Sequence, residues 1–516
     1  MVKRNLIHSL SALLLLTVFL ASCSKKEAYT NVIPADAGLV VSVDVKSMVD
    51  KSGLDDKGNE SMIQNFLGSL KADLNPASYQ QIEKIMKNPE ESGLSVNDRI
   101  YFFSTVKNLA LVVKVADEAK LKGTLKLLEE QKVGTAIESG DGFSWMSLEG
   151  NTLCAFNKDV LLILSSFNSS GIESLKAEAK ILMTQKEANS IRSNKGFNKI
   201  DDRKEDITAY LSLAGMPNMD MVKSAANLPA GVDLKELMIL ASLNFEKGRI
   251  VAKAEMFTEN KELKKMLDEQ AALNKPTGEF FDFFPASTLL FLNYSLNGEK
   301  LYEMLAANPE FSEAVKNQEM GIDVKKLLSS FDGDITAGVT GFTGFGIPTI
   351  VAYAKVNGNY LLELLTAQKQ MIETTLGTAL VATGKDAYVL NYQGMDFFIG
   401  MTGNFLYLTN DRATLTRLNN KVSDPMTDVA WASEVKKSPA FFAINIAEIM
   451  KNPLLSAFAS SGDPQMAMIM TALGGCSYVK VFEASKGVGE MDIVLKNQNE
   501  NVLKQIVTGM KEMTGK

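Results

Sequence analysis

The chain has 516 residues, of which 46% are hydrophobic and 22% charged, and its formal net charge is −7. This composition is that of a folded protein with two to four domains, and it excludes disordered and collagen-like chains. The acidic balance also argues against a nucleic-acid-binding protein, because such proteins carry a basic excess.

Residues 1–22 have the pattern of a secretory signal peptide. Two basic residues precede an apolar run from Leu10 to Leu20, and this run is short for a hydrocarbon core about 30 Å thick. Leu20-Ala21-Ser22-Cys23 resembles the bacterial lipobox, in which the cysteine is lipidated before cleavage on its N-terminal side. We therefore predict a cleaved lipoprotein signal peptide, lipidation of Cys23 and a lipidated tether over 23–32. An ordinary signal peptide that happens to meet a cysteine is the alternative.

Cleavage would remove His8, the only histidine of the chain. A mature protein without histidine excludes Ser-His-Asp and Cys-His catalysis and every histidine-bound metal. Apart from Cys23, the remaining thiols are Cys154 and Cys476, too few for a four-cysteine zinc or iron–sulfur site. Both lie in apolar strand patterns, so we predict buried free thiols, although an oxidising compartment would also permit a disulfide. We expect no metal and no cofactor.

The residues after Cys23 favour the outer membrane, facing the periplasm. Ser24 replaces the aspartate that some bacteria use for inner-membrane retention, and Ser24-Lys25-Lys26-Glu27 has one acidic residue where signals for surface export are acid-rich. The expected partners are therefore the membrane, through the N-terminal lipid, and an unknown envelope ligand or protein.

The rest of the chain repeats a set of landmarks once, in the same order and at nearly constant spacing. This recurrence indicates an internal duplication. The pairs are Ile33–Asp36 with Phe284–Ser287, Glu91–Val96 with Glu319–Val324, Lys114–Val115 with Lys355–Val356, Glu149–Asn151 with Gln393–Met395, and Glu246–Gly248 with Ser485–Gly487.

Each repeat is predicted to be one α+β unit with a mainly antiparallel β-sheet covered by helices. Alternation of apolar and polar residues over 143–148 and consecutive hairpins favour antiparallel pairing. We place the first unit at 33–272 and the second at 280–516. The linker over 273–279 is rich in polar residues, proline and glycine.

These landmarks together resemble a known family. The lipobox, the tether, Pro34-Ala35-Asp36 before the first strand, Gly93-Leu94-Ser95-Val96 before an aromatic strand, and the two-fold repeat are similar to Bacteroidota lipoproteins catalogued as domain of unknown function 4836. The resemblance covers nearly the whole mature chain. It implies the architecture and the envelope location, and it implies no activity.

Three groups of residues are candidates for a site. Asp332-Gly333-Asp334 has carboxylates suited to calcium, but no third acid follows at the required spacing, so a turn before a strand is favoured. Phe342 and Phe345 lie in the glycine-rich segment Gly338–Gly346 and are a candidate contact loop for a membrane or partner; the alternative is that both rings pack on the core. Four methionines, which suit adaptable apolar surfaces and irregular cores alike, are a candidate apolar groove. They are Met216, Met219, Met466 and Met470.

No catalytic constellation stands out in the sequence. We therefore predict a membrane-anchored envelope lipoprotein that is not an enzyme and that binds a ligand or partner. The alternative is a histidine-independent hydrolase that acts on envelope glycans through paired carboxylates, a chemistry for which the 61 acidic residues offer many candidates.

Overall fold

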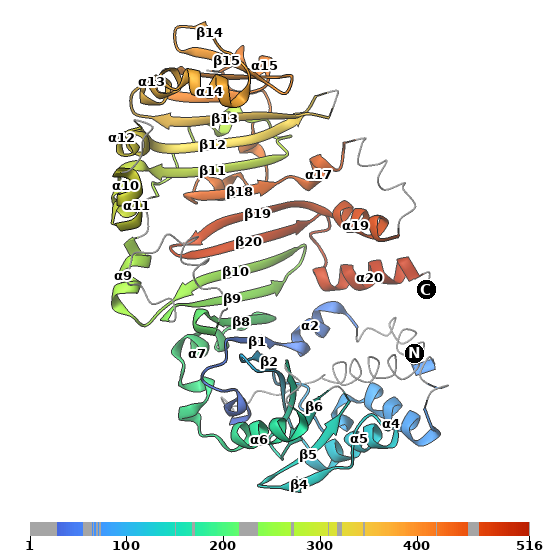
Figure 1. Ribbon diagram of the computed structural model, residues 1–516. Coiled ribbons are helices and arrows are strands. Elements are labelled where there is room, and N and C mark those ends of the chain that lie inside the picture. Colours follow the sequence, from blue (N-terminus) through green and yellow to red (C-terminus); the bar gives the residue numbers. More distant parts are fainter. Residues whose placement is uncertain are drawn as a thin grey trace. The chain divides into compact units, whose positions relative to one another are not determined.

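The computed structural model divides into two compact units (Figure 1). Unit 1 comprises Met1–Met219, Asp233–Thr258 and Gln498–Lys516, and unit 2 comprises Asp220–Val232 and Glu259–Asn497. These units differ from the predicted repeats at the ends of the repeats. Residues 259–272, predicted to end the first repeat, belong to unit 2, and residues 498–516, predicted to end the second repeat, belong to unit 1. The residues that the structure describes are 28–54, 64, 67–68, 71, 74–149, 151–167, 171–215, 236–269, 273–307, 309–316, 322–343, 346–418, 420–452 and 464–514.

The described strands of unit 1 form an antiparallel sheet in the order β10-β9-β8-β1-β2-β3-β7-β6-β5-β4. The tight β4–β5 turn uses Asp141 and Gly142 at positive φ, as a two-residue hairpin requires. The strands are β1 (Leu39–Val43), β2 (Ile100–Ser104), β3 (Asn108–Lys114), β4 (Glu138–Gly140), β5 (Phe143–Leu148), β6 (Thr152–Phe156), β7 (Val160–Ser166), β8 (Ile207–Ser212), β9 (Met238–Phe245) and β10 (Arg249–Phe257).

The helices of unit 1 begin at side chains that cap their free N–H groups. Asp44 accepts from the Ser47 N–H at the start of α2, and Asp117 accepts two N–H groups at the start of α5. The helices are η1 (Ala28–Val32), α2 (Val45–Ser52), α4 (Pro76–Lys87), η3 (Pro89–Ser92), α5 (Glu118–Glu130), α6 (Gly171–Thr184), η4 (Glu187–Asn189), η5 (Ile191–Ser193), α7 (Lys195–Asp201), η6 (Leu213–Gly215) and α20 (Val502–Thr514).

Both faces of the unit 1 sheet carry apolar clusters. On one face, η1, α6 and α7 pack with Phe103, Val112 and Leu162. On the other face, α4 and α5 cover the strands from β3 to β5, where Cys154 and Met146 are buried. Because successive residues of a strand point to opposite faces, β6 and β7 contribute to both clusters and read as nearly continuous apolar runs.

Part of the predicted tether over 23–32 is folded. Residues 28–32 form η1, in which Tyr29 and Val32 are buried, and the Tyr29 hydroxyl donates to the Arg99 carbonyl at 2.8 Å. These two large side chains have enough apolar surface to fix the segment in the core of unit 1. Residues 28–32, which the prediction placed in the tether, therefore belong to the folded body.

The described strands of unit 2 also form an antiparallel sheet, in the order β20-β19-β18-β11-β12-β13-β17-β16-β15-β14. With β1–β10 renumbered as β11–β20, this is the strand order of unit 1. The strands are β11 (Leu290–Asn297), β12 (Phe331–Phe342), β13 (Pro348–Val356), β14 (Leu380–Gly384), β15 (Ala387–Tyr392), β16 (Met395–Thr402), β17 (Phe405–Thr409), β18 (Ala440–Ile444), β19 (Cys476–Ser485) and β20 (Val488–Leu495).

In unit 2, α10, α11 and α12 gather at one end of β11 and β12 (Figure 1). The helices of this unit are α9 (Lys261–Glu269), η8 (Phe281–Phe283), α10 (Gly298–Ala306), α11 (Pro309–Lys316), α12 (Val324–Ser329), α13 (Tyr360–Ala367), α14 (Lys369–Leu376), α15 (Arg412–Leu415), η9 (Met426–Asp428), α16 (Ala432–Val435), α17 (Ile446–Ile449) and α19 (Pro464–Gly475). Nowhere in the described parts of the chain is a helix both long and apolar enough to cross a bilayer.

The core of unit 2 is unusually aromatic and lies on one face of its sheet. Phe291 packs edge-on to Phe281 and Phe284, and Trp431 stacks on Phe441 at 5.6 Å between ring centroids. Edge-to-face and offset pairs of this kind add to the free energy of burial.

The Asp332-Gly333-Asp334 segment lies at the start of β12, within a register shift, and not in a turn before the strand. Asp334 is fully buried and accepts the N–H groups of Thr277 and Gly278 at 2.9 and 2.7 Å, together with the Ser295 hydroxyl. Asp332 is exposed and accepts from Asn274 at 2.9 Å. The two carboxylates thus hold the polar 273–279 segment against the sheet.

The expected α+β class with antiparallel sheets is confirmed. The two units also place their proline landmarks alike: Pro34 forms a β-bridge with Ser190, and Pro285 forms one with Pro425. In unit 1 the N–H of Ala35 donates to the carbonyl of Asn189, the residue before Ser190. In unit 2 the N–H of Ala286 donates to the carbonyl of Asp424, the residue before Pro425.

Candidate ligand-binding face

One face of the unit 2 sheet is apolar and open. Leu292 on β11 lies opposite Phe442 on β18, Phe442 lies opposite Val481 on β19, and Val481 lies opposite Met491 on β20. On the other side, Leu292 lies opposite Ala337 on β12. We call these five residues, with Tyr294, the open face. The aromatic core occupies the opposite face, because Phe291 and Phe441 alternate with Leu292 and Phe442 along their strands.

The side chains of the open face are largely accessible to solvent. Leu292 is 44% exposed, Val481 40% and Met491 37%, and Phe442 and Ala337 are half-buried. The outer face of an antiparallel sheet ordinarily carries polar side chains. A row of apolar side chains across five adjacent strands, each about 4.8 Å from the next, is instead typical of a surface that binds a partner or ligand.

Tyr294 supplies the polar group of the open face and lies to one side of the apolar row. Tyr294 follows Leu292 on the same face of β11 and is 40% exposed. Partial burial and the negative charge of Glu483 raise the pKa of the Tyr294 phenol above its usual value. The phenol therefore stays protonated and can donate a hydrogen bond to a polar group on that side of a bound molecule.

Two helices next to β19 border this region, and one of them carries predicted methionines. Both α17 and α19 contact β19. On α19, Met470 is buried and Met466 is half-buried. Met216 and Met219 lie outside the described residues. The described methionines therefore lie on the helix that leads directly into the strand that carries Val481.

In unit 1 the same sheet positions are differently filled. Val41 lies opposite Ala209, and the row continues through Ala241 and Ala254, so alanines replace Phe442, Val481 and Met491. Toward β7 the face is closed, because Leu121, Leu125 and Leu128 of α5 cover it. The bulky apolar row is thus a feature of unit 2.

Hairpin tips are the second group of exposed apolar residues. Phe342 is the last residue of β12, lies opposite Pro348 and is 45% exposed, whereas Phe345 lies outside the described residues. The equivalent tip in unit 1, between β2 and β3, was not selected from the sequence. Val106 there is 85% exposed, and the neighbouring Phe167 is 61% exposed. A valine within a short polar turn was the available signal.

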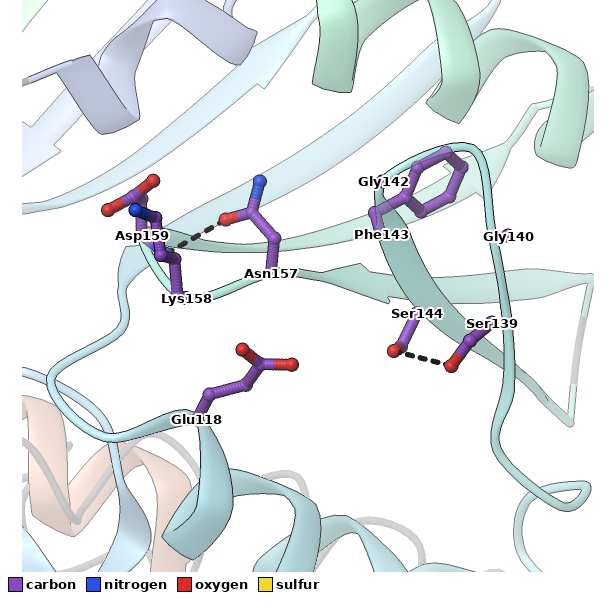
Figure 2. Close-up of a pocket in the computed structure, with 9 residues that line it drawn as sticks. All are labelled: Glu118, Ser139, Gly140, Gly142, Phe143, Ser144, Asn157, Lys158 and Asp159. Carbon is purple, nitrogen blue, oxygen red and sulfur yellow. Dashed lines mark hydrogen bonds between the residues drawn. The ribbon is translucent and has the colours of Figure 1, made fainter.

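A polar pocket of about 390 Å³ lies in unit 1 between the start of α5, the β4–β5 hairpin and the β6–β7 turn (Figure 2). Ser139 and Ser144 hydrogen-bond each other across the hairpin at 2.9 Å. In Figure 2 the Glu118 carboxylate points into the space, whereas that of Asp159 turns away from it. Glu118 also forms an ion pair with Lys122 at 2.8 Å. The figure therefore shows no converging pair of carboxylates of the kind that a glycosidase uses.

Buried acidic residues of the described chain serve in structural networks. Asp206 is fully buried and binds Lys51 through both carboxylate oxygens at 2.7 Å, and it also accepts from Ser47. Arg192 and Asp201 form a nearly buried ion pair at 2.7 Å. Across the described residues, no group of three or more His, Cys, Asp or Glu side chains is arranged to hold a metal ion.

Both described cysteines are free thiols. Cys154 is buried in unit 1, and Cys476 is half-buried at the start of β19. Burial raises the pKa of the Cys154 thiol to about 12. Partial burial also raises the pKa of the Cys476 thiol, and the nearby Lys496 charge opposes that shift.

We expect this difference to appear in thiol labelling of the unlipidated mature chain (residues 23–516 with Cys23→Ala). A pKa near 12 leaves on the order of 1,000-fold less thiolate than in a free cysteine. Native protein should therefore react with a thiol reagent at Cys476 alone, and Cys154 should react after unfolding. A Cys476→Ser variant that still labels rapidly would contradict this assignment.

The sequence from residue 29 to residue 503 matches the family described as "Domain of unknown function (DUF4836)". The chain belongs to this family. No curated protein matches the sequence.

Solved structures with some similarity to this DUF4836 protein are crystal forms I, III and IV of TP0453. Their sequences are 12%, 13% and 14% identical to the chain, and the TM-scores are 0.24, 0.24 and 0.25. Each match covers 48% of this chain and 84%, 87% and 85% of the TP0453 chain, respectively. At these scores the similarity carries no argument about fold or function.

Proposed function

We propose that this DUF4836 protein is a lipid-anchored, non-enzymatic lipoprotein of the Bacteroidota cell envelope that binds an apolar ligand or partner on the open face of unit 2. The anchor is the lipid on Cys23, in the outer membrane and facing the periplasm. The observation that carries the binding role is the row from Met491 to Ala337, which presents apolar side chains where an antiparallel sheet ordinarily meets water.

The chemistry of the row supports an apolar ligand. Its five side chains offer no hydrogen-bonding group, so a sugar or nucleotide placed on it would lose hydrogen bonds to water without replacement. Covering an apolar side chain that is fully exposed contributes about 1.5–3 kcal/mol. Leu292, Val481 and Met491, at about two-fifths exposure, would each contribute a part of that.

We also propose that the units arose by duplication. The shared strand order and the equivalent Pro34 and Pro285 bridges support common ancestry. Under this proposal unit 1 keeps the shared strand order with alanines at the equivalent positions, and unit 2 carries the binding surface.

Binding to the open face can be measured with 11-(dansylamino)undecanoic acid, whose fluorescence rises in an apolar environment. We expect saturable binding to the unlipidated mature chain. Val481→Lys and Leu292→Lys should each weaken binding at least tenfold, or about 1.4 kcal/mol, because each places an ammonium within the apolar row.

Ile181→Lys on α6 is the matched control, since Ile181 is an apolar side chain of unit 1 that is 60% exposed. It should bind the probe as the unsubstituted chain does. Equal affinity of all three variants, or no saturable binding by the unsubstituted chain, would contradict the proposal.

A further inference from the structure

The β2–β3 hairpin of unit 1 ends in a hydrogen-bonded turn with an apolar apex. The Thr105 N–H donates to the Asn108 carbonyl at 2.9 Å. The Thr105 hydroxyl accepts the N–H groups of Lys107 and Asn108 at 3.2 and 3.1 Å. The intervening Val106 has no part in these hydrogen bonds, and it is 85% exposed. Its exposure is therefore fixed by an ordered turn.

A second apolar side chain lies beside this apex. Asn108 lies opposite Ser166 at the end of β7, and the Phe167 N–H donates to the Lys107 carbonyl at 3.0 Å. Phe167 is 61% exposed. Val106, Lys107 and Phe167 thus come from two loops that a hydrogen bond holds together, and we call these three residues the unit 1 tip.

We propose that the unit 1 tip inserts into the interfacial region of a lipid bilayer that contains anionic lipid. A tip of this kind has apolar groups for the acyl boundary and a lysine whose ammonium can reach the headgroups. Lys107 is exposed, and no ion pair of the described residues involves it, so its charge is available to anionic lipid. A turn at the end of two paired strands is convex, and a bilayer interface accepts a convex apolar group without a matching pocket.

The equivalent tip of unit 2 supports this inference independently. The β12–β13 hairpin corresponds to the β2–β3 hairpin in the strand order, and Phe342 at its end is also exposed. Exposed apolar residues therefore occur at the same hairpin of both units. The inference goes beyond the proposed ligand site, and it does not depend on lipidation of Cys23.

The test is co-sedimentation of the unlipidated mature chain with vesicles of phosphatidylcholine and phosphatidylglycerol at 3:1. We expect binding that falls at least tenfold in Val106→Asp and in Phe167→Asp, because each variant places a carboxylate at the acyl boundary. Lys107→Gln should weaken binding to these vesicles and leave binding to pure phosphatidylcholine unchanged. Ile181→Asp, on the exposed face of α6, is the matched control and should bind as the unsubstituted chain does.

A second measurement reports insertion directly. Val106→Cys in a chain whose other cysteines are replaced by serine can carry an NBD fluorophore, and its emission should shift to the blue when vesicles are added. Absence of vesicle binding, equal binding of the Val106→Asp and Ile181→Asp variants, or an unshifted NBD spectrum would each overturn the proposal. Unchanged urea unfolding of the tip variants, followed by Trp145 fluorescence in a Trp431→Phe background, would show that unit 1 is folded, so a loss of vesicle binding could be assigned to the tip alone.

Discussion

Cys23→Ala is expected to move the protein from the membrane fraction to the soluble fraction when the full chain is expressed in a bacterium that processes lipoproteins. Each buried CH₂ of an acyl chain adds about 0.8 kcal/mol, and two or more chains hold a protein on a membrane stably. Insertion of Val106 and Phe167 is far weaker and reversible. Triton X-114 partitioning should therefore place the unsubstituted protein in the detergent phase and the variant in the aqueous phase.

Ser24→Ala is the control, because it changes the neighbouring residue and leaves the thiol in place. It should retain both detergent partitioning and incorporation of radiolabelled palmitate. A Cys23→Ala protein that still incorporates palmitate or stays in the detergent phase would contradict lipidation at this position. Five residues separate Cys23 from helix η1, counting Cys23 itself, and five residues can span at most about 17 Å, so a lipidated protein would be held close to its membrane.

Much of the architecture could be predicted because turn residues mark it directly. The hairpins at Glu246–Gly248 and Ser485–Gly487 were placed correctly, since Gly248 and Gly487 take positive φ in them. The sequence did not show where the closing helices pack. Helix α20 contacts α2 in unit 1, and such a contact depends on tertiary packing that periodicity does not encode.

The candidate surfaces were harder to predict for a different physical reason. Leu292, Phe442 and Val481 lie in separate parts of the sequence, and strand register alone brings them into one row. Alternating apolar positions predict a strand with one buried face, and they do not reveal that both faces are apolar until the neighbouring strands are known. Phe342 was identified because its tip is rich in glycine, whereas Val106 has no such marker.

The role of Asp334 leads to the second large expected effect. Its carboxylate is fully buried and accepts the N–H groups of Thr277 and Gly278, the Thr277 hydroxyl and the Ser295 hydroxyl. In Asp334→Ala these donors lose their acceptor, and a buried donor without a partner costs about 1–3 kcal/mol. We therefore expect the free energy of unfolding of unit 2 to fall by about 3 kcal/mol or more.

The two tryptophans of the chain allow this loss to be assigned to one unit. Trp431 is buried in the aromatic core of unit 2, and Trp145 lies in unit 1. In a Trp145→Phe background, urea unfolding followed by Trp431 fluorescence reports unit 2, and a Trp431→Phe background reports unit 1. Following each unit separately avoids treating a two-unit chain as one transition.

Asp332→Ala supplies the matched control, because Asp332 is two residues away, exposed and accepts one hydrogen bond from Asn274. Its effect should stay within about 0.5 kcal/mol, as for other surface substitutions. If Asp334→Ala and Asp332→Ala shifted the Trp431 transition equally, the buried carboxylate would not be what fixes 273–279 against the sheet. If Asp334→Ala shifted the Trp145 transition more than the Trp431 transition, it would destabilise unit 1 more than unit 2, which would contradict the prediction.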